Sequence, residues 1–180
     1  LNNNKLKIYF ADFWPNFQFE DNYFYHLLSS EYDVQITPNN PDLLFHSVDY
    51  LKKNEYREFQ NTNTKKIFYT GENTIPDFNK TDYSFSFVDN LGPNNYRLPL
   101  WVLFINWFNL KNNNLRDPSF LIPVNKLQSS HYRNNPVKPF FCSFIASKPT
   151  GRRIDFVPKI DSVKRVHNLG RLYSNSYLKA

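Results

Sequence analysis

The sequence lacks several features that would assign it to a protein class at once. Its 180 residues include a single cysteine, Cys142, and no methionine. One cysteine excludes an internal disulfide and is typical of a reducing compartment, so we expect a cytoplasmic protein. The missing methionine leaves open whether the N-terminus was trimmed, the chain is a piece of a longer protein, or methionines were lost.

Long apolar runs are missing as well. The longest candidate, residues 98–108, is interrupted by Pro99 and Asn106. It falls short of the roughly 18 residues that a membrane-spanning helix needs. Lys5 and Lys7 lead directly into a strand-like segment, so we expect no signal peptide. The sequence therefore predicts neither a membrane span nor a leader.

Several catalytic signatures are absent. The chain has no G-x-S-x-G elbow, no G-x-G-x-x-G fingerprint and no P-loop. Four histidines show no metal-ligand spacing: His26, His46, His131 and His167. Cys142 lies inside an apolar segment. We therefore assign structural roles to these side chains and expect no metal site.

The residues that are present suffice for a substantial core. Hydrophobic residues make up 41% of the chain and aromatic residues 18%, which argues against wholesale disorder. Charge is distributed unevenly. Residues 148–180 hold eight of the 22 Lys and Arg residues but two of the 16 Asp and Glu residues, so they carry all of the net charge of +6. Such a shift marks a change of domain or role, and a basic segment favours an anionic partner.

Apolar and helical patterns alternate through the first part of the chain. Strands are predicted at residues 6–10, 32–37, 43–46, 65–70 and 83–88, and helices at 22–30, 50–60 and 100–110. This alternation predicts βαβ units and a largely parallel sheet covered on both faces.

A second unit is predicted after a break. Residues 111–138 hold three prolines and many Asn and Ser residues, so we interpret them as a linker or crossover. An apolar strand is predicted at 139–147, a helix follows Gly151, and a further strand is predicted at 163–169.

The segment KKIFYTGENTIPDFNKTDYSFSFV, residues 65–88, contains the clearest candidate site. An apolar strand ends at Gly71-Glu72-Asn73, where the glycine allows a sharp turn and Glu72 is the first charged side chain. Ligands of open α/β sheets bind beyond the carboxyl ends of the strands. Glu72 is thus either a functional carboxylate at the mouth of the sheet or a solvated residue in an ordinary strand-to-loop transition.

The segment FFCSFIASKPTGRR, residues 140–153, is similar to the first βα unit of a nucleotide-binding sheet. Its strand ends in Ala146 and Ser147, and Arg152 and Arg153 follow the turn at the start of a helix. A helix N-terminus attracts anions, and arginine binds phosphate oxygens through paired hydrogen bonds. The alternative is that both arginines are solvated residues of a first turn.

Three motifs resemble those of the bacterial and viral α-1,3/1,4-fucosyltransferases, in the family's order. They are IFYTGENTIPDFNKTDYSFSF (67–87), YRLPL (96–100) and FFCSFIAS…RRIDF (140–156). The resemblance extends across most of the chain. It implies an α/β fold of the GT-B type, with a Rossmann-like, largely parallel sheet flanked by helices and a second Rossmann-like domain that is incomplete. Residues 1–110 are then the acceptor-binding domain, 111–138 the linker, and 139–180 the beginning of the GDP-fucose-binding domain.

The resemblance also implies a reaction. L-fucose moves from GDP-β-L-fucose to the 3-hydroxyl of N-acetylglucosamine or glucose in an oligosaccharide acceptor, with inversion and without a metal cofactor. Glu72 occupies the position of the family's proposed general base. Arg153, with Arg152 and Ser147, is expected to contact the donor, because the family places this arginine shortly before an aromatic residue, here Phe156.

The acceptor side is expected to involve Asn73 and Trp14. The acidic, aromatic and basic stretch that continues the family's donor domain has no match before Ala180. We therefore expect little or no activity from this chain alone. Peripheral membrane association is expected only through a C-terminal region outside this chain.

Two other interpretations stay open. One is a non-catalytic oligosaccharide-binding module, in which Trp14 and Phe13 stack on sugar rings instead of packing in the core. The other is a nucleic-acid contact through the basic C-terminus, with Tyr173 and Tyr177 interleaved. No recognised motif supports the second, so no nucleic-acid partner is expected.

Overall fold

A computed structural model describes residues 5–49, 51–111, 121–128, 140–148, 150–168 and 170–171. Contacts divide the chain into two compact units, Leu1–Gln128 and Ser129–Ala180. The division falls inside the segment predicted as a linker. The structural role predicted for His131 and the contact considered for Tyr173 and Tyr177 fall on residues outside the described part of the chain.

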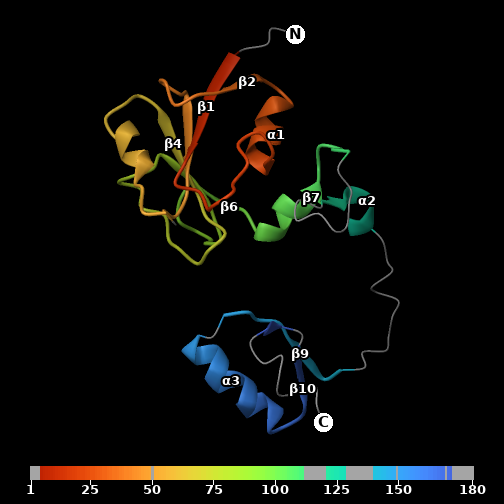
Figure 1. The fold of residues 1–180 in the computed structure, drawn as a ribbon. Coiled ribbons are helices and arrows are strands. Elements are labelled where there is room, and N and C mark those ends of the chain that lie inside the picture. Colours follow the sequence, from red (N-terminus) through yellow and green to blue (C-terminus); the bar gives the residue numbers. More distant parts are fainter. Residues whose placement is uncertain are drawn as a thin grey trace. The chain divides into compact units, whose positions relative to one another are not determined.

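The first unit is built on a six-stranded sheet with the order β2-β1-β3-β4-β5-β6 (Figure 1). The strands are β1 (Lys5–Ala11), β2 (Asp33–Ile36), β3 (Leu43–His46), β4 (Lys65–Tyr69), β5 (Tyr83–Ser86) and β6 (Asn95–Arg97). All five pairings are parallel. The carboxyl ends of the strands therefore lie at one edge, where α/β proteins bind their ligands. This sheet confirms the predicted α/β class.

One face of the sheet is covered by α1 (Tyr23–Ser29), which begins where the Asn22 side chain accepts a hydrogen bond from the Tyr25 N–H (3.0 Å). The buried Phe24 ring of α1 lies 5.0 Å from the rings of both Phe45 and Tyr69. Burying an aromatic side chain of this size stabilises the fold by about 1.5–3 kcal/mol. The largest core cluster of the described residues lies on this face.

The other face is covered by the short 3₁₀ helix η1 (Glu55–Phe59). Its Phe59 packs in a second cluster with Ala11 and Leu44. Successive strand residues point to opposite faces, which is why Leu44 joins this cluster while its neighbour Phe45 joins the first. Near-continuous apolar strands thus serve a sheet that is covered on both sides.

The helix predicted at residues 50–60 is wrong, because only η1 forms there. Lys52 and Asn54 adopt left-handed backbone with φ of 56° and 54°, which interrupts the helical path. The Asp12 carboxylate, from the loop after β1, accepts the backbone N–H groups of the first two residues of η1 at 2.9 and 3.0 Å. A contact between distant segments therefore fixes a single turn where the local pattern predicts a full helix.

The buried helix predicted at residues 100–110 is also wrong. The segment forms a 3₁₀ helix, η2 (Leu100–Phe104), followed by β7 (Ile105–Asn106). The Asn106 side chain accepts the Leu110 N–H (2.7 Å) and donates to the Leu110 carbonyl (2.8 Å), which closes a loop in place of a further helical turn. Trp101 is 56% exposed, so this segment is only partly buried.

Part of the segment predicted as a linker forms a strand and a helix. β7 pairs in parallel with β8 (Ile122–Pro123), and α2 (Val124–Leu127) follows directly. A two-residue strand that contains proline leaves no pattern that sequence reasoning recognises. No helix among the described residues is both long and apolar enough to cross a membrane.

The strand β6 is a further difference from the prediction, because its sequence Asn-Tyr-Arg is too short and polar to predict a strand. Its Asn95 side chain accepts hydrogen bonds from the buried hydroxyls of Ser84 (2.7 Å) and Ser86 (2.8 Å) on β5. The Asn95 amide nitrogen donates to the Val88 carbonyl (2.7 Å). This polar network attaches the edge strand to the sheet, together with the parallel backbone pairing and a ring contact between Phe85 and Tyr96 (5.9 Å).

We expect Asn95→Ala to lower the free energy of unfolding by about 1–3 kcal/mol, because it leaves two buried hydroxyls without their acceptor. Urea unfolding followed by circular dichroism measures the loss. Asn94→Ala, at the exposed neighbouring position, is the matched control and should change the value by less than about 0.5 kcal/mol. Equal losses in both variants would contradict this role of Asn95.

The second unit contains β9 (Cys142–Phe144), α3 (Gly151–Asp161) and β10 (Val166–Asn168). β9 and β10 pair in parallel, so the three elements form a βαβ unit. The strand predicted at 139–147 is shorter than expected and only partly buried, since Ile145 is 73% exposed. Val157 of α3 and Val166 of β10 are buried and form its apolar interior.

Candidate active site at the carboxyl edge of the sheet

Glu72 lies on the turn that follows β4, at the carboxyl edge of the six-stranded sheet. Thr70 is fully buried, and its hydroxyl accepts the Glu72 N–H (2.9 Å). The Glu72 carbonyl in turn accepts the Thr74 N–H (2.8 Å). Glu72 and Asn73 are both exposed. Hydrogen bonds to the backbone thus hold the turn, one of them involving the buried Thr70 hydroxyl. The turn presents a carboxylate and an amide at the edge of the sheet.

The sequence predicts that Gly71 allows a sharp backbone turn, but its role in the structure is different. Its backbone does not use the left-handed conformation that favours glycine. A Cβ atom at this position would instead lie 3.2 Å from Leu100 Cδ1 and 3.5 Å from the Tyr69 hydroxyl. The glycine therefore provides room for Leu100 to pack beside the turn.

A cavity of about 420 Å³ opens on the α1 face beside this turn. We call it the α1 cavity. Its lining residues come from the loop after β1, from α1 and its N-terminal turn, from β4, and from the 100–121 region: Trp14, Asp21, Asn22, Tyr23, Phe24, His26, Tyr69, Leu100, Leu103, Phe104, Ile105, Phe108, Leu110 and Leu121. Tyr69 and Leu100, the neighbours of Gly71, both belong to this wall.

Trp14 packs against core residues and also lines the α1 cavity. Its ring packs edge-on against Phe17 (5.0 Å) and Tyr69 (6.4 Å), and 41% of its surface is exposed. Phe13 is buried and stacks on Phe17 (4.1 Å), so Phe13 is a core residue. Of the two aromatic residues considered for stacking on a sugar, only Trp14 is accessible.

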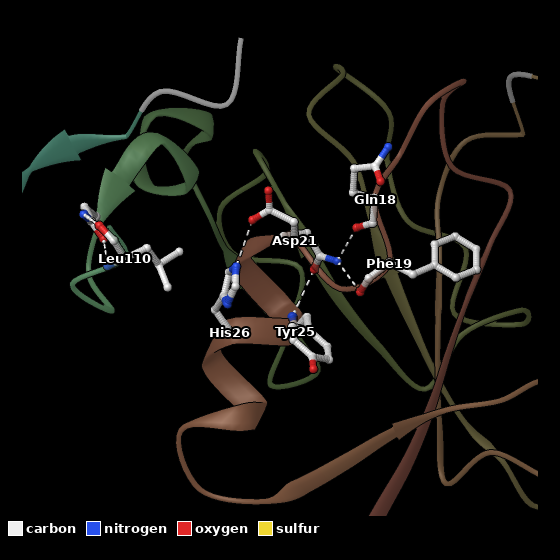
Figure 2. A network of polar contacts seen from close by, with 8 residues as sticks. Gln18, Phe19, Asp21, Tyr25, His26 and Leu110 are labelled. Carbon is white, nitrogen blue, oxygen red and sulfur yellow. Dashed lines mark hydrogen bonds and ion pairs between the residues drawn. The ribbon is translucent and has the colours of Figure 1, made fainter. Parts of the chain in front are cut away.

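A polar network lies at the start of α1, next to the same cavity (Figure 2). An Asp21 oxygen lies 3.0 Å from His26 Nε2, and Figure 2 shows the two side chains facing one another. Asn22 holds the segment in place, because its amide nitrogen donates to the carbonyls of Gln18 (2.9 Å) and Phe19 (3.0 Å). Sequence reasoning assigned His26 a structural role and did not single out Asp21. No spacing rule predicts a pair formed across the beginning of a helix.

His46 is buried at the carboxyl end of β3, where it stacks on Tyr56 (5.3 Å) and lies 5.3 Å from the Phe68 ring. Its Nε2 has no hydrogen-bond partner in the described structure. Burial, together with the nearby Lys66, lowers the pKa of His46 to about 4, so the imidazole is neutral at physiological pH. A second cavity, of about 250 Å³, lies here on the opposite face.

The predicted donor residues gather in the second unit. Ser147 follows β9, and Arg152 and Arg153 lie in the first turn of α3. All three are exposed, and Arg153 Nη1 lies 3.5 Å from the Lys148 carbonyl. The unit therefore combines a strand end, a helix N-terminus and two cations, which suits an anionic ligand.

Gly170, which sequence reasoning did not single out, belongs to the same edge of the second unit. A Cβ atom there would come closer than 3.0 Å to the backbone of Ala146. This close approach requires glycine. Within the part of the chain that the structure describes, no group of three His, Cys, Asp or Glu residues could hold a metal ion.

These features define an α/β protein with a carboxylate at the carboxyl edge of a parallel sheet. Residues 8–104 match the family model described as the alpha-(1,3)-fucosyltransferase FucT N-terminal domain, and the chain belongs to this family. The predicted family is thereby confirmed.

Proteins similar to this chain in sequence and in structure are α-1,3-fucosyltransferases. The alpha-(1,3)-fucosyltransferase FucT of Helicobacter pylori is 29% identical over 187 residues, which cover 89% of this chain and 38% of the relative. A crystal structure of α1,3-fucosyltransferase with GDP-fucose superimposes with a TM-score of 0.59 at 25% identity, and one with GDP with a TM-score of 0.58 at 27% identity. Each covers 94% of this chain and 54% of the solved chain. The predicted GT-B-type α/β fold is confirmed. The chain spans about half the length of these solved relatives and 38% of the Helicobacter pylori protein.

Proposed function

We propose that this chain forms the acceptor side and the first part of the donor side of an inverting α-1,3-fucosyltransferase. The exposed carboxylate of Glu72 carries the proposal, because it lies at the carboxyl edge of a parallel sheet beside the α1 cavity. Solved relatives with GDP-fucose and with GDP support the donor class. We assign residues 1–110 to acceptor binding, 111–138 to the connection and 139–180 to donor binding.

Glu72 acts as the general base in this proposal. The 3-hydroxyl of an N-acetylglucosamine or glucose unit attacks the anomeric carbon of fucose while the Glu72 carboxylate takes its proton. The bond from that carbon to the diphosphate oxygen breaks on the opposite side, so the anomeric centre inverts and GDP leaves as an anion. A base at 2.6–3.2 Å from the hydroxyl contributes about 10²–10⁴ to the rate.

The second unit stabilises the leaving group. Arg153, with Arg152 and Ser147, binds the diphosphate at the N-terminus of α3, where fixed positive charge opposes the negative charge of departing GDP. The proposal needs no metal, because the arginines supply this charge. Asn73 and Trp14, in the first unit, hold the acceptor.

A transfer assay tests the proposal. The 180-residue chain and a fusion of this chain with the remaining donor domain of a family member are each incubated with GDP-fucose and N-acetyllactosamine. Mass spectrometry then measures the fucosylated product. We expect product from the fusion and none above the blank from the chain alone.

The two halves of the proposal fail separately. Appreciable turnover by the chain alone would refute its need for the rest of a donor domain. A folded fusion that binds N-acetyllactosamine but transfers no fucose would refute the enzyme and favour an oligosaccharide-binding module.

A further inference from the structure

We propose that the α1 cavity binds a pyranose ring of the acceptor, and that the Asp21–His26 pair selects its orientation by hydrogen bonding to the ring hydroxyls. The inference rests on the proposed function, since it names where that reaction's acceptor lies. It adds a ligand class to the cavity and a role to the Asp21–His26 pair.

The size and position of the α1 cavity suit this ligand. About 420 Å³ lies within the range of roughly 300–1,000 Å³ that is typical of small-molecule sites. Tyr69 and Leu100 form its wall and are also the side chains nearest to Gly71, one residue before Glu72. A sugar in the cavity therefore lies next to the turn that carries the proposed base.

The apolar part of the lining fits the C–H face of a pyranose. Trp14 is accessible, yet Phe17 and Tyr69 hold its ring edge-on. A ring fixed in advance loses little conformational entropy when a ligand stacks on it. The remaining wall is largely aromatic and aliphatic, as in most small-molecule sites.

The polar part of the lining includes Asp21 and His26, together with Asn22, whose side chain is bonded to nearby backbone groups. The 3.0 Å contact between Asp21 and His26 joins a carboxylate that is 60% exposed at its side chain to an imidazole that is 19% exposed. A pair whose carboxylate is largely exposed contributes only about 0–1 kcal/mol to stability, and the Asp21 carboxylate stays accessible to a ligand. A carboxylate and an imidazole together accept and donate hydrogen bonds, which is what a sugar hydroxyl needs on its two sides.

Such a pair also implies selectivity. A site built to hydrogen-bond a hydroxyl discriminates against the analogue that lacks it, because its own polar groups are then left unpaired. Asn22 strengthens this argument, since its bonds to Gln18 and Phe19 fix the segment that carries Asp21. The pair is thus held in place before any ligand binds.

The test is a titration of the ¹⁵N-labelled 180-residue chain with N-acetyllactosamine, followed by NMR. The chain has three tryptophans, so the indole N–H signals can be assigned with one Trp→Phe variant each. We expect the Trp14 indole signal to shift and that of Trp101, which does not line the cavity, to stay in place. Trp14→Ala should weaken binding about tenfold or more, and Trp101→Ala should leave it unchanged.

The pair is tested by its own variants. His26→Ala and Asp21→Asn should each weaken binding about tenfold. Asp89→Asn, which removes the surface ion pair with Arg97 (3.2 Å), is the matched control and should bind as the parent does. Among monodeoxy analogues of the acceptor sugar, one should bind the parent chain and His26→Ala equally, because it lacks the hydroxyl that the pair contacts.

Three results would overturn the inference: no shift of the Trp14 signal at millimolar sugar, parent-like binding by folded His26→Ala and Asp21→Asn chains, or no deoxy analogue that cancels the effect of His26→Ala. The NMR spectrum of each variant reports directly whether it is folded. GDP-fucose takes no part in the titration. A failure of transfer in the fusion assay therefore refutes the proposed enzyme while leaving the sugar site standing, and the reverse outcome refutes this site alone.

Discussion

Glu72→Gln is expected to lower kcat for fucosyl transfer by about 10²–10⁴-fold in the fusion that contains a whole donor domain. Glutamine keeps the size of the side chain but cannot take the acceptor proton. The turn itself should be unchanged, because Thr70 binds the backbone N–H of residue 72 and not its side chain. The Kd for GDP-fucose, measured by calorimetry, should therefore equal that of the parent.

Two further variants sharpen this expectation. Glu72→Asp retains a carboxylate on a shorter side chain, so it should recover part of the lost rate. Asp77→Asn removes another exposed carboxylate of the same segment, one paired with Lys80 (3.0 Å), and should leave kcat close to the parent value. Unchanged turnover in Glu72→Gln would exclude Glu72 as the base, and a parallel loss of GDP-fucose binding would indicate a different role.

The central strands were predictable because their physical cause is local. β1, β3 and β4 are apolar on both faces of a covered sheet, and their sequences show it. The incorrect predictions arise from contacts with residues elsewhere in the sequence. Asp12 limits the helix predicted at 50–60 from more than 40 residues away, and the serines of β5 hold β6 through Asn95. Sequence patterns register neither kind of contact.

The candidate site likewise has one feature that the sequence predicts and others that it does not. A strand that ends in Gly71-Glu72-Asn73 places a carboxylate at a sheet edge, and the structure has it there. The α1 cavity depends on Tyr69 and Leu100 meeting beside a glycine that needs space and not an unusual backbone angle. The Asp21–His26 pair depends on how the chain enters α1. Such features arise only when segments distant in sequence pack together.

Arg153→Ala is expected to lower kcat/KM in the same fusion by about 10²–10³-fold, because it removes a fixed cation from the site where GDP develops charge. The Kd for GDP alone should rise as well, since the arginine already binds the diphosphate in the ground state. Isothermal titration calorimetry measures the Kd for GDP, and the transfer assay measures kcat/KM, so the loss of nucleotide binding is separated from the loss of rate.

The controls for Arg153 come from its own helix. Lys159→Ala removes a cation from the last turn of α3, so it changes the net charge equally but away from the N-terminus, and GDP affinity should stay at the parent value. Arg153→Lys keeps the charge but loses the paired hydrogen bonds, so it should restore only part of the affinity. Equal losses in Arg153→Ala and Lys159→Ala would mean that general positive charge, and not this arginine, attracts the nucleotide. A loss confined to Arg153 would instead assign the diphosphate to the N-terminus of α3, as phosphate sites of βαβ units are built.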